Sequence, residues 1–100
     1  MFTVQLTTEF QDWLDALTDK QAQIRIVARL RQAEGGNLGD WGAIRGGLSE
    51  MRVHFGPGYR LYFTRRGRVL VVVLCGGKKA TQARDIKRAI GILKKLDIDS

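Results

Sequence analysis

The sequence contains very little cysteine, histidine and proline. Cys75, His54 and Pro57 are the only residues of these three types. A single cysteine cannot form an internal disulfide, which favours a reducing compartment, and we expect the cytoplasm. One histidine and one cysteine far apart in the chain do not supply the clustered ligands of a structural zinc site. We therefore expect no metal and no cofactor.

Long apolar runs and acidic residues are also scarce. No apolar stretch approaches the roughly 20 residues needed to cross a bilayer, and the N-terminus lacks the pattern of a secretory signal, so we expect no export and no membrane contact. Lys and Arg outnumber Asp and Glu by 17 to 10, and a net charge of +7 on 100 residues attracts polyanions such as RNA or DNA. A hydrophobic content of 44% fits a single domain, residues 1–100.

Hydrophobic periodicity predicts strands and helices in the order β-α-α-β-β-β-α. The expected elements are a strand at 2–6, a helix from Thr8 to about Thr18, a helix capped by Asp19 and running to about Glu34, an irregular loop at 35–47 anchored by Trp41 and Ile44, strands at 48–55, 59–65 and 68–75, and a helix from about Thr81. This order is typical of an α+β fold, an antiparallel sheet packed against a helical hairpin and a C-terminal helix.

Two neighbouring strands are predicted to share one polar face. Side chains alternate across a strand, so Glu50, Arg52 and His54 lie together on the face opposite the apolar residues. The next strand adds Arg60 and Tyr62 by the same parity. We expect the apolar face to meet the helices and the polar face to carry any chemistry.

These groups match what cleavage of RNA by its own 2′-hydroxyl requires, namely a base, a cationic clamp on the phosphate and an acid. Arg52 and Arg60 are candidate clamps because a guanidinium donates two parallel hydrogen bonds to phosphate. Glu50 is a candidate base, and His54 is a candidate base or acid. Tyr62 is a candidate for stacking on an RNA base.

Each of these residues also has a purely structural interpretation. Glu50 and Arg52 suit an exposed ion pair worth about 0–1 kcal/mol. His54 suits a surface position beside the turn that contains Pro57, and Tyr62 suits the cover of a sheet. The sequence of the polar face is therefore compatible both with a catalytic site and with a purely structural role.

A short segment after the last expected strand combines glycines with lysines. Gly76 and Gly77 precede Lys78 and Lys79. The P-loop pattern GxxxxGK[ST] is absent, but two glycines that free the backbone before a helix N-terminus loosely resemble a phosphate-binding turn. We expect Lys78 and Lys79 to contact RNA, with plain solvation as the alternative. Cys75 is expected to be a core residue at the strand end and not a nucleophile.

Three segments, GLSEMRV at 47–53, GYRLYF at 58–63 and VLCGGKK at 73–79, are followed by Asp85, Ile86 and Ala89. Together they resemble the addiction-module killer proteins of the RelE/ParE superfamily, in its HigB-like branch with phage-derived members. The resemblance implies a RelE-like fold and a cytoplasmic toxin that cuts messenger RNA in the ribosomal A site, without a metal, and so inhibits translation. It also implies a cognate antitoxin, usually a helix-turn-helix, HigA-like protein. The toxin is then expected to contact operator DNA only through this antitoxin.

The resemblance also assigns positions within the site. The matching basic sheet positions are Arg52, Arg60, Lys78 and Lys79, and Glu50 and Tyr62 match recurrent positions of this branch. Some RelE proteins use a C-terminal catalytic tyrosine, which has no counterpart here because Tyr62 is the last tyrosine. The resemblance thus leaves open which residue is the general acid and which is the base.

Two other functions fit the same pattern. ParE toxins share the fold and poison DNA gyrase by protein contact without cutting RNA, and the basic C-terminal helix is compatible with that activity. The Glu50, Arg52 and Arg60 cluster favours the nuclease, because a gyrase-binding protein has no need of it. A non-catalytic RNA-binding module is the third alternative.

Overall fold

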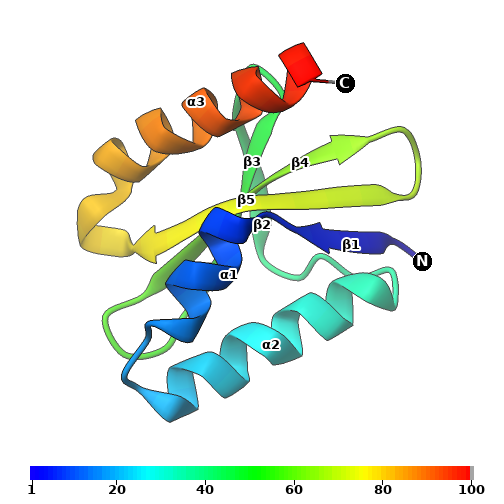
Figure 1. The fold of residues 1–100 in the computed structure, drawn as a ribbon. Coiled ribbons are helices and arrows are strands. Elements are labelled where there is room, and N and C mark those ends of the chain that lie inside the picture. The colour runs from blue at the N-terminus through cyan, green and yellow to red at the C-terminus, as the bar shows by residue number, and fades with distance from the viewer. Residues whose placement is uncertain (100) are drawn as a thin grey trace.

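The computed structural model describes the backbone of residues 1–99 and the side chains of residues 1–97 (Figure 1). Its elements are β1 Thr3–Leu6, α1 Thr8–Asp15, α2 Lys20–Glu34, β2 Trp41–Arg45, β3 Leu48–Val53, β4 Tyr59–Arg66, β5 Leu70–Lys78, a 3-10 turn η1 Lys79–Thr81, and α3 Gln82–Asp99. Among the described residues, no helix combines the length and the apolar composition needed to span a membrane.

The five strands form one sheet in the order β1-β5-β4-β3-β2. Neighbouring strands are antiparallel except for β1, which pairs with β5 in parallel. The predicted α+β class, with a sheet, a helical hairpin and a C-terminal helix, is confirmed, and the parallel edge is an addition to the antiparallel sheet that we expected.

The loop expected at 35–47 is wrong in its second half, because Trp41–Arg45 forms the edge strand β2. Trp41 pairs with Met51 and Gly42 pairs with Glu50 in β3. The glycines around this segment make it look irregular in sequence, yet its exposure alternates residue by residue as in an edge strand. Backbone pairing with β3, a contact that local composition does not report, outweighs the turn-forming neighbours.

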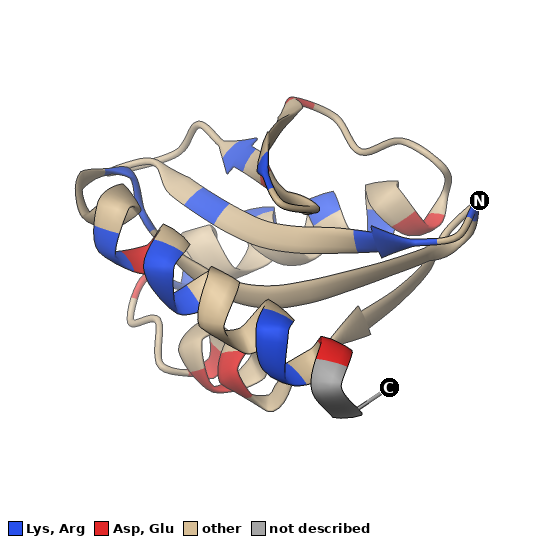
Figure 2. Cartoon of the chain, turned by 90° about the horizontal axis from the view of Figure 1, so that it is seen from above, with Lys and Arg blue, Asp and Glu red and all other residues tan. Residues whose placement is uncertain are grey.

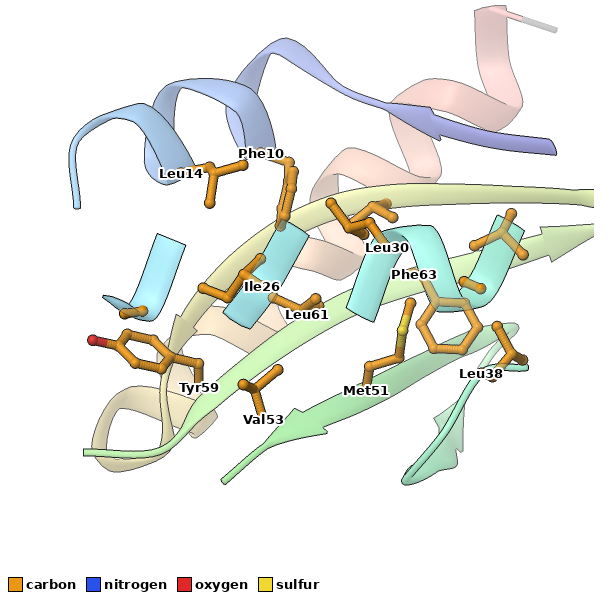
Figure 3. Close-up of a cluster of buried hydrophobic side chains, with 14 residues drawn as sticks. Phe10, Leu14, Ile26, Leu30, Leu38, Met51, Val53, Tyr59, Leu61 and Phe63 are labelled. Atoms are coloured by element: carbon orange, nitrogen blue, oxygen red, sulfur yellow. The ribbon is translucent and has the colours of Figure 1, made fainter. Parts of the chain in front are cut away.

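Both faces of the sheet are covered by helices. The hairpin of α1 and α2 packs on one face and α3 on the other (Figure 1). On the hairpin side, Phe10, Ile26 and Phe63 lie in the larger apolar cluster (Figure 3), and burial of each such side chain contributes about 1.5–3 kcal/mol. β5 contributes Val73 to this cluster and Leu74 to the cluster under α3, so the prediction that the last strand is covered on both sides is confirmed.

The helix caps place the hairpin on the sheet. Asp19 caps α2 as predicted, accepting hydrogen bonds from the backbone N–H groups of the next turn. The cap of α1 is Thr7, the residue before the helix: its Oγ1 accepts a hydrogen bond from Phe10 N at 3.1 Å and donates one to the carbonyl oxygen of Leu74 at 2.6 Å. That second bond ties the start of α1 to β5, a contact between residues far apart in the sequence.

Candidate active site

A buried carboxylate holds two arginines together on the α3 side of the sheet. Glu50 is only 5% exposed. Its Oε2 accepts hydrogen bonds from Arg52 Nε at 3.0 Å and from Arg60 Nη1 at 3.2 Å, and its Oε1 accepts one from Gln82 Nε2 at 2.8 Å. These donors from β3, β4 and α3 offset the cost of removing a carboxylate from water.

The register of the sheet explains why the two arginines meet. Arg52 of β3 lies directly opposite Arg60 of β4. Two like charges at facing positions destabilise a sheet, and the shared Glu50 carboxylate compensates for that repulsion. The Arg52 side chain is 32% exposed and that of Arg60 is 11% exposed, so Arg52 is the more accessible of the two to solvent. The structure thus brings together three of the residues predicted for the site.

At the outer edge of this cluster, Asp40 connects Arg52 to His54. Asp40 Oδ1 accepts a hydrogen bond from Arg52 Nη1 at 2.9 Å, and Asp40 Oδ2 lies 2.5 Å from His54 Nε2. The bond with His54, followed by that with Arg52, holds the pKa of Asp40 below its usual range. Asp40 in turn raises the pKa of Arg52. The His54 side chain is 73% exposed and so accessible to a ligand.

Two further residues of the cluster, Asp40 and Gln82, were not predicted from the sequence. Asp40 sits between Gly39 and Trp41 in a segment that looked like a loop, and Gln82 begins α3. Neither residue lies in a recognisable motif, so only the fold reveals their contacts. Among the described residues, no group of three or more His, Cys, Asp or Glu side chains is arranged to hold a metal ion.

Arg29 of α2 fixes the backbone around Asp40. Arg29 Nη2 donates to the carbonyl oxygens of Leu38 at 2.9 Å and Asp40 at 3.2 Å, and its Nη1 donates to the carbonyl oxygen of Arg52. Gly42 leaves room for the Arg52 side chain, because a Cβ there would lie 2.6 Å from Arg52 Nη2. The positions of the Asp40 carboxylate and the Arg52 guanidinium are therefore set by backbone contacts and by a missing side chain.

Tyr62 lies on the same face of the sheet but cannot serve as predicted. Its exposed fraction is 0%, and it packs with Leu74 and Leu93 beneath α3. Burial, followed by the nearby Glu50 charge, raises the pKa of Tyr62. An RNA base cannot stack on a fully buried ring, so the stacking role expected for Tyr62 is wrong in this structure. The reason is that α3 covers this part of the polar face.

The pair Gly76 and Gly77 does not form the phosphate-binding turn that we expected. Both residues lie inside β5, opposite Leu61 and Arg60, and neither has a positive φ. A Cβ at Gly76 would lie 2.4 Å from the ring of Trp13, and close packing on the other face excludes one at Gly77. Packing against both faces of the sheet, and not backbone freedom, explains the glycines.

Lys78 and Lys79 directly follow this pair at the end of β5. Lys78 is the last residue of β5, Lys79 begins η1, and both are exposed. Gly77 pairs with Arg60, which places the two lysines close to the arginine cluster along the sheet. Lys and Arg recur along α3 and on the strands (Figure 2).

Replacing Gly77 by alanine is expected to lower the free energy of unfolding by about 1–3 kcal/mol. The added Cβ would lie 1.9 Å from Asp85 Oδ2, and Asp85 is 2% exposed and accepts a hydrogen bond from Thr81 at 2.5 Å, so the carboxylate has little room to move. Gly91→Ala is the matched control, because a Cβ on that exposed helical residue meets nothing within 4 Å. The control should gain about 0.5–1 kcal/mol. Urea unfolding measures both, and a Gly77→Ala protein as stable as Gly91→Ala would contradict the packing argument.

Cys75 is a buried core residue, as predicted. Its exposed fraction is 0%, and burial raises the pKa of the Cys75 thiol to about 11. Because the unfolded thiol ionises near 9.0, the contribution of Cys75 to stability is complete below that pH and is lost as the pH rises toward 11. We expect a thiol reagent such as DTNB to react with Cys75 at pH 8 only after unfolding. Equal reaction rates in folded and unfolded protein would contradict this.

The chain is similar to known proteins over most of its length. A family model described as "Phage derived protein Gp49-like (DUF891)" matches residues 12–95. A protein of Haemophilus influenzae described as "Uncharacterized protein" is 41% identical over 86 residues, which cover 86% of this chain and 87% of the relative. The region matched by the family model includes the whole cluster from Asp40 to Gln82.

Proposed function

Because the chain belongs to the Gp49-like family of phage-derived proteins, which are RelE-like toxins, we propose that it is a HigB-like toxin that cleaves messenger RNA on the ribosome. The family is associated with toxin–antitoxin systems. One observation supports the nuclease most strongly: Arg52 and Arg60 share one buried carboxylate beside an exposed His54 that is hydrogen-bonded to Asp40.

In the proposed reaction, the 2′-oxygen of one nucleotide attacks its neighbouring phosphorus and the bond from phosphorus to the 5′-oxygen breaks. The products are a 2′,3′-cyclic phosphate and a free 5′-hydroxyl. Arg52 and Arg60 donate hydrogen bonds to the non-bridging phosphate oxygens, whose negative charge increases in the transition state. Each guanidinium has five N–H donors, so donors remain after Glu50 and Asp40 are bound.

His54 transfers one of the two protons that the reaction moves, either from the 2′-hydroxyl or to the 5′-oxygen, and solvent water takes up or supplies the other. Asp40 fixes the orientation of the imidazole through its bond to Nε2. Glu50 is a positioning residue in this proposal and not the base, because both of its oxygens already accept hydrogen bonds from Arg52, Arg60 and Gln82.

The proposed partners follow from the charge and the family. Lys78 and Lys79 contact the phosphates of the messenger beside the cleaved bond. A cognate antitoxin, of the helix-turn-helix, HigA-like class, silences the toxin in the cytoplasm, and operator DNA is contacted through that antitoxin.

Primer extension on a defined messenger in a purified translation system tests the proposal. We expect truncations at fixed codon positions that require ribosomes, require this protein, and are absent with Arg60→Ala. Intact messenger beside active ribosomes would overturn the nuclease. Growth inhibition without cleavage, together with loss of DNA supercoiling activity by gyrase, would instead identify a ParE-like poison.

A further inference from the structure

We propose that a hollow beside Trp41 binds one unpaired nucleotide of single-stranded RNA, with the base stacked on the indole and the phosphates paired with Arg45 and Arg65. The proposal rests on the proposed function, because it supplies a second contact for the same RNA strand. It also replaces the stacking contact that the buried Tyr62 cannot make.

The hollow lies at the free edge of the sheet. It has a volume of about 390 Å³ and is lined by β2, by the start of β3, by the glycines at 46 and 47 that join them, and by Arg65 of β4. Sites for small ligands commonly enclose 300–1,000 Å³. The hollow therefore has space for one nucleotide.

Trp41 supplies an aromatic surface that is already positioned. It is 38% exposed, one of few large apolar side chains in the described chain that reach solvent to this extent. The centroid of its ring lies 6.0 Å from that of the Phe63 ring, at an interplanar angle of 58°. The indole therefore packs against the core and also lines the hollow. A base can stack on such a ring without sequence preference, and little conformational entropy is lost because the ring is already held.

The charges of the hollow favour an anion. Arg45 and Arg65 both line it and both are exposed, and the Arg65 guanidinium is held 5.1 Å from the centroid of the Phe2 ring. No acidic side chain of the described residues contributes to its lining. A purely apolar partner would bury two guanidiniums without counter-charges, which is costly, whereas RNA brings a phosphate for each.

The hollow and the arginine cluster lie on either side of one edge strand. Trp41 directly follows Asp40, whose carboxylate binds Arg52 and His54. β2 is the last strand of the sheet, so no further strand blocks its outer edge. The Arg52 guanidinium lies beside Gly42, the residue after Trp41, on the α3 side of the sheet, whereas the Trp41 ring lies on the hairpin side against Phe63. An RNA strand with its scissile phosphate at Arg52 therefore has to pass around this free edge to place a neighbouring base on Trp41.

Binding of a fluorescently labelled 2′-O-methyl RNA oligonucleotide, followed by anisotropy, tests the site. This RNA has no free 2′-hydroxyl and cannot be cleaved, so the measurement reports binding alone. Trp41→Ala should weaken binding about 10-fold, within the range of about 5- to 150-fold for loss of one stacked base, and Trp41→Phe should retain most of the affinity. Ile24→Ala, at an apolar residue on α2 that is 62% exposed, is the matched control and should bind normally.

The arginines have their own readout. Arg45→Ala and Arg65→Ala should each reduce the slope of log affinity against log salt by about 1, as expected when one phosphate contact is lost. Arg68→Ala, an exposed arginine in the turn between β4 and β5, is the control for general charge and should leave the slope closer to that of the unaltered protein.

Two outcomes overturn the proposal: equal affinity of Trp41→Ala and the unaltered protein, or no saturable binding by the unaltered protein. Failure of the proposed function looks different. If Trp41→Ala loses affinity while ribosome-bound messenger stays intact, the hollow binds RNA and the nuclease proposal fails. If messenger is cut but Trp41→Ala binds RNA normally, the nuclease proposal stands without this hollow.

Discussion

Replacing His54 by alanine is expected to slow cleavage of ribosome-bound messenger by about 10²- to 10⁴-fold, the usual effect of losing a general acid or base. The fold should be unaffected, because the His54 side chain is 73% exposed and its one observed hydrogen bond is to Asp40 on the surface. Single-turnover primer extension gives the rate, and thermal unfolding of the same preparation checks the fold.

Asp40→Asn is the companion to this variant. The amide can still bridge Arg52 and His54 but lacks the negative charge, so we expect a smaller loss of rate, on the order of 10-fold. Cleavage by folded His54→Ala protein at the normal rate would exclude proton transfer by His54, and would leave Arg52 and Arg60 as the groups that lower the barrier.

Arg60→Ala is expected to reduce the cleavage rate by roughly 30- to 1,000-fold, equivalent to about 2–4 kcal/mol of lost transition-state stabilisation. Glu50 would keep its hydrogen bonds from Arg52 and Gln82, so the protein should still fold, with a loss of about 1–3 kcal/mol of stability for the donor removed. Growth inhibition in cells and primer extension in the purified system report the loss of function.

Arg60→Lys and Arg68→Ala make this test specific. Lysine keeps the charge but lacks the planar pair of donors, so Arg60→Lys should recover only part of the rate. Arg68 lies in the turn between β4 and β5, away from the cluster in the chain, and its loss should change cleavage little. Full toxicity of a soluble Arg60→Ala protein would exclude this face of the sheet as the catalytic site.

Much of the architecture was predictable because it depends on local periodicity. The stripe of α2, the cap at Asp19 and the double apolar face of β5 follow from spacing within single elements. The parity that joins Glu50, Arg52 and Arg60 was predictable for the same reason, since alternation across a strand needs no knowledge of its neighbours.

The errors concern contacts between distant parts of the chain. β2 becomes a strand only through pairing with β3, and Tyr62 is buried only because α3 crosses above it. Gly76 and Gly77 looked like a flexible turn, but Trp13 and Asp85 require them to be small. In each case a partner far away in the sequence overrides a local signal.

The sequence by itself therefore determined the α+β class, the basic charge and which side chains share the polar face, because composition and alternation are properties of the chain alone. Only the tertiary structure decided what that face can do. It joined Asp40 to His54 and Gln82 to Glu50, removed Tyr62 from solvent and placed Trp41 at a free edge. The physical reason is that hydrogen bonds and burial depend on distances in space, and residues far apart in sequence come close only when the sheet and its helices have packed.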